Sequence, residues 1–332
     1  MADLAQEAGL NGDESALGGA SKLFVHLWSV AWSHSAGTIA GDAEALHDMR
    51  VAIRRLRSAM QCFEGPRAAP LLDSHLREEM ASHRKKLGAL GDVLGAVRDC
   101  DVLHEYLTEY AEKELRITVA EAPGLARFEQ FLHQERERAF GPMVESIQRA
   151  QQPRRLREKF GRFALGFSAA SAPPLSLCDA AEIVFPQRVE EVMANAPALD
   201  DDEDAEAQHE LRKSLKRLRY SLEFFAPCRA TAIKPHLKKL ASLQDLLGEM
   251  NDRHVLHQSA HRAFAAPAKT GKRKQKEVKA AHEYSYNEDS LPADVALFLQ
   301  FGDERATVLL NKVRLEWHKR QEQDWPSVLR LL

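Results

Sequence analysis

The chain has 332 residues, of which 44% are hydrophobic and 29% are charged, and 46 basic against 49 acidic side chains give a formal net charge of −3. These proportions are typical of a globular protein with room for two domains of ordinary size. They exclude a protein that attracts polyanions through overall charge, so any anion site has to come from how the cations are distributed.

Residues 1–20 are rich in glycine and acidic side chains, and we expect a flexible N-terminus. They lack the basic start and apolar core of a secretory signal, and no apolar run elsewhere approaches the roughly 20 residues that span a membrane. The four cysteines form no CxxC pair, which favours free, mostly buried thiols in a reducing compartment. The sequence therefore predicts a cytoplasmic protein without membrane attachment.

Helical patterns follow almost without interruption after residue 20, whereas strand-like alternation is absent. The expected helices cover residues 21–36, 42–64, 69–113, 119–150, 176–196, 204–226, 230–264 and 291–320. Four helices in each half predict an all-α protein of two four-helix bundles, at 21–150 and 176–332. A linker at 151–175 is expected between them, because Pro153, Pro173 and Pro174 interrupt the helical pattern there.

A basic motif occurs twice, at an offset of 209 − 47 = 162 residues. His47-x-x-Arg50-x-x-x-Arg54-Arg55-x-Arg57 returns as His209-x-x-Arg212-Lys213-x-x-Lys216-Arg217-x-Arg219. On a helix, the His-led row of each copy falls within an arc of about 80°, opposite an apolar stripe. A solvated helix face is the alternative. However, neighbours three and four positions apart in the row are also cations and repel one another, which indicates an external anion.

A second basic cluster also recurs, because His83-Arg84-Lys85-Lys86 aligns with His236-Leu237-Lys238-Lys239. Packing of adjacent antiparallel helices would bring both clusters of one half onto one surface. Just downstream lie Asp99 and Asp252, which are interpreted as counter-charges that position arginines rather than as catalytic acids. Gly95 and Gly248 are interpreted as places of close helix approach or of a local bend.

Residues 267–292 interrupt the second half with six lysines or arginines followed by two tyrosines. The helical pattern weakens there, which favours a disordered loop. A mobile basic arm that covers a bound polyanion is the alternative.

The repeated motif, together with the Leu-Gly-x-x-Arg-Asp-x-Asp-Val run from Leu94 to Val102, resembles the CHAD (conserved histidine α-helical domain) family. The resemblance covers nearly the whole chain beyond residue 20. It implies two four-helix bundles related by a pseudo-twofold axis, with a basic groove or channel between them. It also implies binding of inorganic polyphosphate and association with polyphosphate granules. The second half departs from the pattern where Arg98 and Asp101 become Asn251 and His254.

The expected function is therefore non-catalytic polyphosphate binding, without metal or cofactor, and with polyphosphate-granule proteins as further partners. The expected polyphosphate-binding residues are His47, Arg50, Arg54, Arg55, Arg57, His83, Arg84, Lys85, Lys86, His209, Arg212, Lys213, Lys216, Arg217, Arg219, His236, Lys238 and Lys239. One alternative is a polyphosphate or triphosphate hydrolase with a divalent metal, although the motifs hold few carboxylates. Another is a nucleic-acid-binding helical protein, although the rows lack aromatic platforms. A scaffold for an acidic protein partner is the third.

Overall fold

The computed structural model describes residues 4–64, 67, 71–169, 175–200, 204–228, 230–265 and 291–323, and its regular elements are all helical. The first half contains α1 (Leu4–Glu7), α2 (Ala16–Ser33), α3 (Ser35–Ala40), α4 (Ala43–Gln61), α5 (Ser74–Tyr110), α6 (Pro123–Gln151) and α7 (Leu156–Gly166). The second half contains α8 (Leu177–Asn195), α9 (Ala205–Phe224), α10 (Ala230–Phe264) and α11 (Ala293–Gln323). The all-α fold class is confirmed.

Side-chain caps begin the helices that carry the basic motifs. The carboxylate of Asp42 accepts hydrogen bonds from two backbone N–H groups at the start of α4, and that of Asp204 accepts one at the start of α9. Asp73 caps α5 in the same way. Each cap satisfies donors that a helix start leaves unpaired, so the first turn of each helix is fixed by local sequence.

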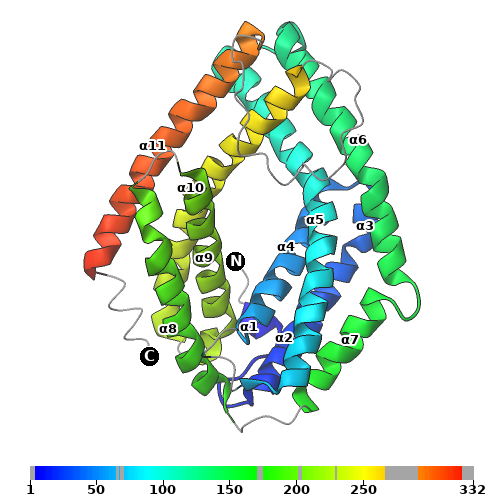
Figure 1. The fold of residues 1–332 in the computed structure, drawn as a ribbon, viewed down its shortest axis with the longest axis vertical. Coiled ribbons are helices and arrows are strands. Elements are labelled where there is room, and N and C mark those ends of the chain that lie inside the picture. Colours follow the sequence, from blue (N-terminus) through cyan, green and yellow to red (C-terminus); the bar gives the residue numbers. More distant parts are fainter. Residues whose placement is uncertain are drawn as a thin grey trace.

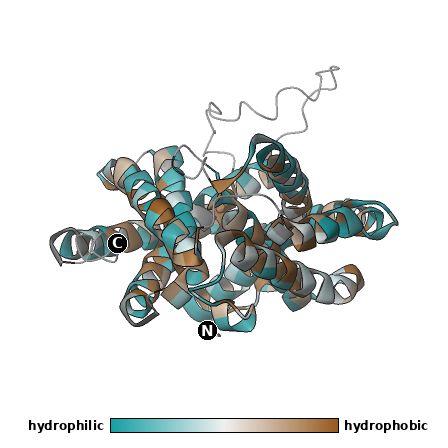
Figure 2. Ribbon diagram, turned by 90° about the horizontal axis from the view of Figure 1, so that it is seen from below, coloured by the Kyte–Doolittle hydropathy of each residue, from teal (hydrophilic) through white to brown (hydrophobic). Residues whose placement is uncertain are grey.

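The two halves share their hydrophobic cores. The helices of the first half and those of the second stand opposite each other in Figure 1, with α4 facing α9. The larger apolar cluster takes buried residues from both halves, and Phe63 after α4 packs with its ring centroid 6.1 Å from that of Phe224 in α9. The helices carry both hydrophilic and hydrophobic residues around their circumference, as Figure 2 shows.

A second, smaller apolar cluster joins the far ends of the long helices. It combines the C-terminal part of α5 and the N-terminal part of α6 with the corresponding ends of α10 and α11. Tyr110 and Phe128 of the first half both contact Phe298 of α11, with ring centroids 4.8 and 6.4 Å away. The halves are therefore in contact at both ends of the molecule (Figure 1).

Three expectations need correction. Residues 4–20 are not a loose tail, because Leu4 is buried against the main core and α2 already begins at Ala16. The expected linker contains α7, whose Phe160 and Phe163 are buried. Cys178 and Cys228 form a disulfide with their Cα atoms 5.2 Å apart, whereas Cys62 and Cys100 are free.

The basic segment 267–292 falls almost entirely outside the described residues. Among the helices that the structure describes, none is long and apolar enough to cross a membrane. The division into two bundles stays a prediction.

Candidate basic binding surface

The first basic row lies on α4, whose opposite face is fixed in the core by Met49, Ile53 and Leu56. The guanidinium groups of Arg50 and Arg57 in this row contact the neighbouring helix α5 at its glycines. A Cβ atom on Gly95 would be 3.4 Å from Nη2 of Arg50, and one on Gly88 would be 3.4 Å from Nη2 of Arg57. The guanidinium groups of α4 thus approach the backbone of α5 at these glycines, which fits the expected close approach at Gly95 rather than the expected local bend.

The cations of both halves meet around Asp99 of α5. The Nη2 atom of Arg50 lies 3.4 Å from a carboxylate oxygen of Asp99, as the counter-charge interpretation expects. Desolvation raises the pKa of the Asp99 carboxyl, whereas Arg50 of α4, Arg212 of α9 and Arg98 of α5 act in the opposite direction. An arginine from each copy of the motif thus lies close enough to act on the same carboxyl group.

Arg54 connects the copies directly. Its Nε donates a 2.9 Å hydrogen bond to the hydroxyl oxygen of Tyr220 in α9, and this hydroxyl brings no compensating charge. Among the residues that the structure describes, neither Arg54 nor Arg57 is paired with a carboxylate. The first copy therefore retains positive charge that no carboxylate of the described residues neutralises.

His47 lies at the start of this row and is exposed. Partial desolvation lowers the pKa of its imidazole, and Arg98, Arg54 and Arg50 lower it further against the opposing effect of Asp48. The net electrostatic effect at His47 thus comes from cations, even though Arg98 is itself paired with Glu105 at 2.9 Å. An anion beside His47 would oppose this shift, because it favours the charged imidazole.

Several other predicted residues are already ion-paired within the protein. Arg55 lies 3.7 Å from Glu223, Arg84 2.7 Å from Glu64, Lys213 2.7 Å from Glu210, Arg217 3.0 Å from Glu191, and Arg219 2.9 Å from Glu223. Arg219 also donates to Gln244 at 3.0 Å, at the position that aligns with Gly91. The second copy is therefore more strongly neutralised than the first.

His83 does not belong to this surface, which corrects the prediction. Its side chain is buried between the rings of Phe160 and Phe163, whose centroids lie 5.4 and 4.8 Å away. Burial lowers the pKa of His83 to about 4, and Lys86 and Lys159 act in the same direction. The ring is therefore a neutral part of the apolar core.

The remaining predicted cations lie on the surface of the long helices. Lys85 and Lys86 on α5 and Lys238 and Lys239 on α10 are exposed, whereas His209 on α9 and His236 on α10 are half-buried. Their role, and a groove between the halves, stay predictions.

The model of the CHAD domain family matches residues 25–261. The chain belongs to the CHAD family. A crystal structure of the CHAD domain from the plant Ricinus communis superposes with a TM-score of 0.65 at 23% sequence identity, covering 95% of each chain. PptA from Streptomyces chartreusis superposes with a TM-score of 0.56 at 15% identity, covering 92% of this chain and 100% of that one. No curated protein sequence matches significantly.

Membership in the CHAD family is consistent with a polyphosphate-related function. Within this CHAD protein, the motif did not reveal Tyr220 or the glycines of α5 as parts of the surface. The spacing of Gly88, Gly91 and Gly95 at positions i, i+3 and i+7 was the available signal, because it places all three on one helix face.

The burial of His83 predicts a pH-dependent stability. Because its pKa in the folded protein is about 4 and its ordinary value is 6.5, the unfolded chain binds more protons between these values. Stability is therefore full above pH 6.5 and falls as the pH drops toward 4. Urea unfolding should show that, between pH 7.5 and pH 5, the free energy of unfolding falls by about 2 kcal/mol more in the wild type than in His83→Leu. Equal losses in both proteins would contradict the buried, neutral ring.

Proposed function

We propose that the protein binds inorganic polyphosphate, without cleaving it, on a shared basic surface. This surface is defined by His47, Arg50, Arg54 and Arg57 of α4 together with Arg212 and Lys216 of α9. The observation that carries the proposal is that, among the described residues, no carboxylate pairs with Arg54, which contacts α9, or with Arg57, which lies beside α5. Guanidinium groups bind phosphate oxygens through paired, charge-assisted hydrogen bonds, and Arg50 and Arg57 lie beside the glycines of α5.

A linear polymer suits this surface better than a single phosphate does. The cations follow two helices, so a chain of phosphates can neutralise several of them in succession. Each charge-assisted hydrogen bond contributes roughly 1.5–3 kcal/mol, and counterion release adds a salt-dependent contribution. Ordering of side chains and loss of solvation oppose these gains. Because the second copy is more strongly ion-paired, the first copy is expected to contribute most of the affinity.

Isothermal titration calorimetry with long-chain polyphosphate tests the proposal. We expect saturable binding at low salt that weakens steeply as salt is added, with a tenfold or greater loss in Arg54→Glu. Arg162→Glu, an exposed change of equal charge on α7, is the matched control and should retain most of the affinity. Absence of binding heat at low salt, or equal affinities in both variants, would contradict the proposal.

Polyphosphate binding is also expected to couple to protonation of His47. Partial desolvation and the surrounding cations lower the pKa of His47 in the free protein, and a bound anion raises it. Binding therefore takes up a proton at pH values between the pKa of the free protein and that of the complex. The resulting gain in affinity is complete below the pKa of the free protein and is lost as the pH rises through the pKa of the complex. Affinity should increase as the pH is lowered from 8 to 6, by up to about tenfold per unit of pKa difference.

Titrations of the wild type and His47→Gln at both pH values check this coupling. The glutamine variant should lose most of the pH dependence, because interior phosphates of a long chain do not titrate in this range. An identical pH dependence in both proteins would place the titrating group elsewhere.

The surface would also recruit the protein to polyphosphate granules. A fluorescent fusion should localise to granules, whereas the Arg54→Glu fusion should remain dispersed at equal expression. The hydrolase alternative requires orthophosphate release from polyphosphate in the presence of magnesium or manganese. The nucleic-acid alternative requires single-stranded DNA or RNA to displace polyphosphate. Tyr220, whose hydroxyl accepts the hydrogen bond from Arg54, is buried and offers no platform for a base.

A further inference from the structure

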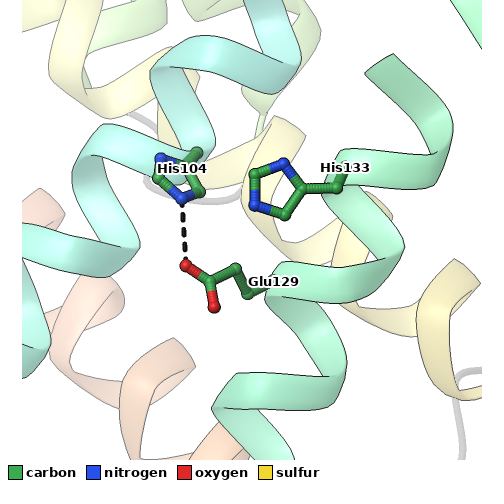
Figure 3. A group of neighbouring side chains, drawn as sticks. All are labelled: His104, Glu129 and His133. Atoms are coloured by element: carbon green, nitrogen blue, oxygen red, sulfur yellow. Dashed lines mark hydrogen bonds and ion pairs between the residues drawn. The ribbon is translucent and has the colours of Figure 1, made fainter. Parts of the chain in front are cut away.

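Two histidines and a glutamate gather outside both basic motifs. His104 lies on α5, and Glu129 and His133 lie one turn apart on the neighbouring helix α6. One potential ligand atom from each residue lies within 4.8 Å of the others, and Nε2 of His104 is 3.0 Å from a carboxylate oxygen of Glu129. Figure 3 shows the two rings and the carboxylate facing a common point.

Both histidines also line a cavity of about 350 Å³. Asp101 and Arg136 line the same cavity, and they form an ion pair of 2.6 Å with each other. The second carboxylate oxygen of Asp101 is buried without a hydrogen-bond partner among the described residues. The positive charge of Arg136 is thus compensated, and an unsatisfied acceptor remains beside the histidines.

The electrostatic surroundings of the cavity favour a cation. Cys100, another residue of its lining, has its pKa raised to about 11, first by burial and then by the carboxylates of Glu135, Asp101 and Asp99. At Cys100, one turn before His104, these carboxylates outweigh the opposing effect of Arg262.

We propose that His104, Glu129 and His133 bind a divalent transition-metal ion, with zinc as the best fit. Two imidazole nitrogens and one carboxylate oxygen are a ligand set that zinc accepts in tetrahedral sites. Donor atoms about 2.1 Å from a tetrahedral ion lie roughly 3.4 Å apart, so small side-chain rotations close the present spacing. Three protein ligands leave the fourth position to water on the cavity side.

The site is independent of polyphosphate binding, because none of its ligands belongs to the shared basic surface. α5 and α6 pack directly against each other, with Leu107 and Phe128 buried in the apolar cluster between them. The ligands therefore project from helices that are already fixed, and metal binding requires no rearrangement of the backbone.

Competition between metal-stripped full-length protein and a chromogenic zinc chelator tests the site. We expect one strong zinc site per chain, with the affinity reduced at least tenfold in His104→Ala and in His133→Ala. His318→Ala, which changes an exposed histidine on α11, and Cys100→Ser should both retain it. His133 is exposed, so its replacement should leave the helical circular dichroism unchanged.

Zinc should also raise the Tm of the wild type, and this increase should be lost in His133→Ala. Cobalt(II) provides a second readout, because bound tetrahedral cobalt has visible absorption bands that should disappear in the same variants. Zinc affinity and Tm increases that are unchanged in both histidine variants would overturn the proposal.

Discussion

Reversing two charges together, Arg54→Glu and Lys216→Glu, should remove measurable polyphosphate binding. Each reversal eliminates a cation and places an anion beside the polymer, so the pair should cost about 3–6 kcal/mol, or more than a hundredfold in affinity. The two residues lie on α4 and α9, in corresponding positions of the two copies of the motif. The loss should therefore exceed that of either single change.

Calorimetry at low salt measures this loss, and circular dichroism checks that the variant is folded. Arg138→Glu with Arg162→Glu is the matched control, because both arginines are exposed and lie on α6 and α7. The control has the same net charge as the test variant. Similar weakening in both proteins would mean that overall charge, rather than this surface, determines binding.

Replacement of Phe63 by alanine should destabilise both halves together. Phe63 is 1% exposed and contacts Phe24 and Phe167 of the first half and Phe224 of the second. Removing a buried phenylalanine costs about 3–5 kcal/mol in free energy of unfolding, because a cavity remains. Since one apolar cluster includes both halves, we expect a single unfolding transition that shifts as a whole.

Urea unfolding followed by circular dichroism and by tryptophan fluorescence checks this expectation. Trp28 and Trp32 report on the first half, and Trp317 reports on the second. Leu165→Ala, at an exposed site on α7, should leave the transition in place. Two separate transitions, of which only the earlier one moves in Phe63→Ala, would show that the halves unfold independently.

The helices and the two basic rows could be predicted from sequence because both have a local signal. Apolar positions at helical spacing define α4 and α9, and Asp42 and Asp204 cap them. The contacts between the halves have no such signal. The hydrogen bond from Arg54 to Tyr220 joins residues 166 positions apart, and the disulfide joins cysteines 50 positions apart.

The error about His83 had a different cause. A histidine at the head of a lysine-rich segment resembles a ligand for an anion, but helical spacing turns it away from Lys85, and only Lys86 shares its side of α5. The rings that bury it come from α7, which lay in the expected linker. Leu156, Phe160 and Phe163 at positions i, i+4 and i+7 were a helical signal there, and the flanking prolines concealed it.

The ion pairs of the second copy also had a partial signal. Glu223 lies four positions after Arg219, a spacing at which opposite charges on a helix meet. The basic row itself contains only cations at neighbouring positions, so it does not predict that Glu223 neutralises Arg219. One ion pair of the second copy therefore follows from a residue just outside the repeated motif, whereas Glu191, the partner of Arg217, comes from α8 and had no local signal.

A crystal structure of the protein with bound tripolyphosphate tests the central claim most directly. If both copies of the motif hold the polyanion, one continuous ligand should contact Arg54 of α4 and also Lys216 or Arg212 of α9. Phosphates bound only to the outer lysines of α5 and α10, or to one copy alone, would contradict a surface shared by the two halves.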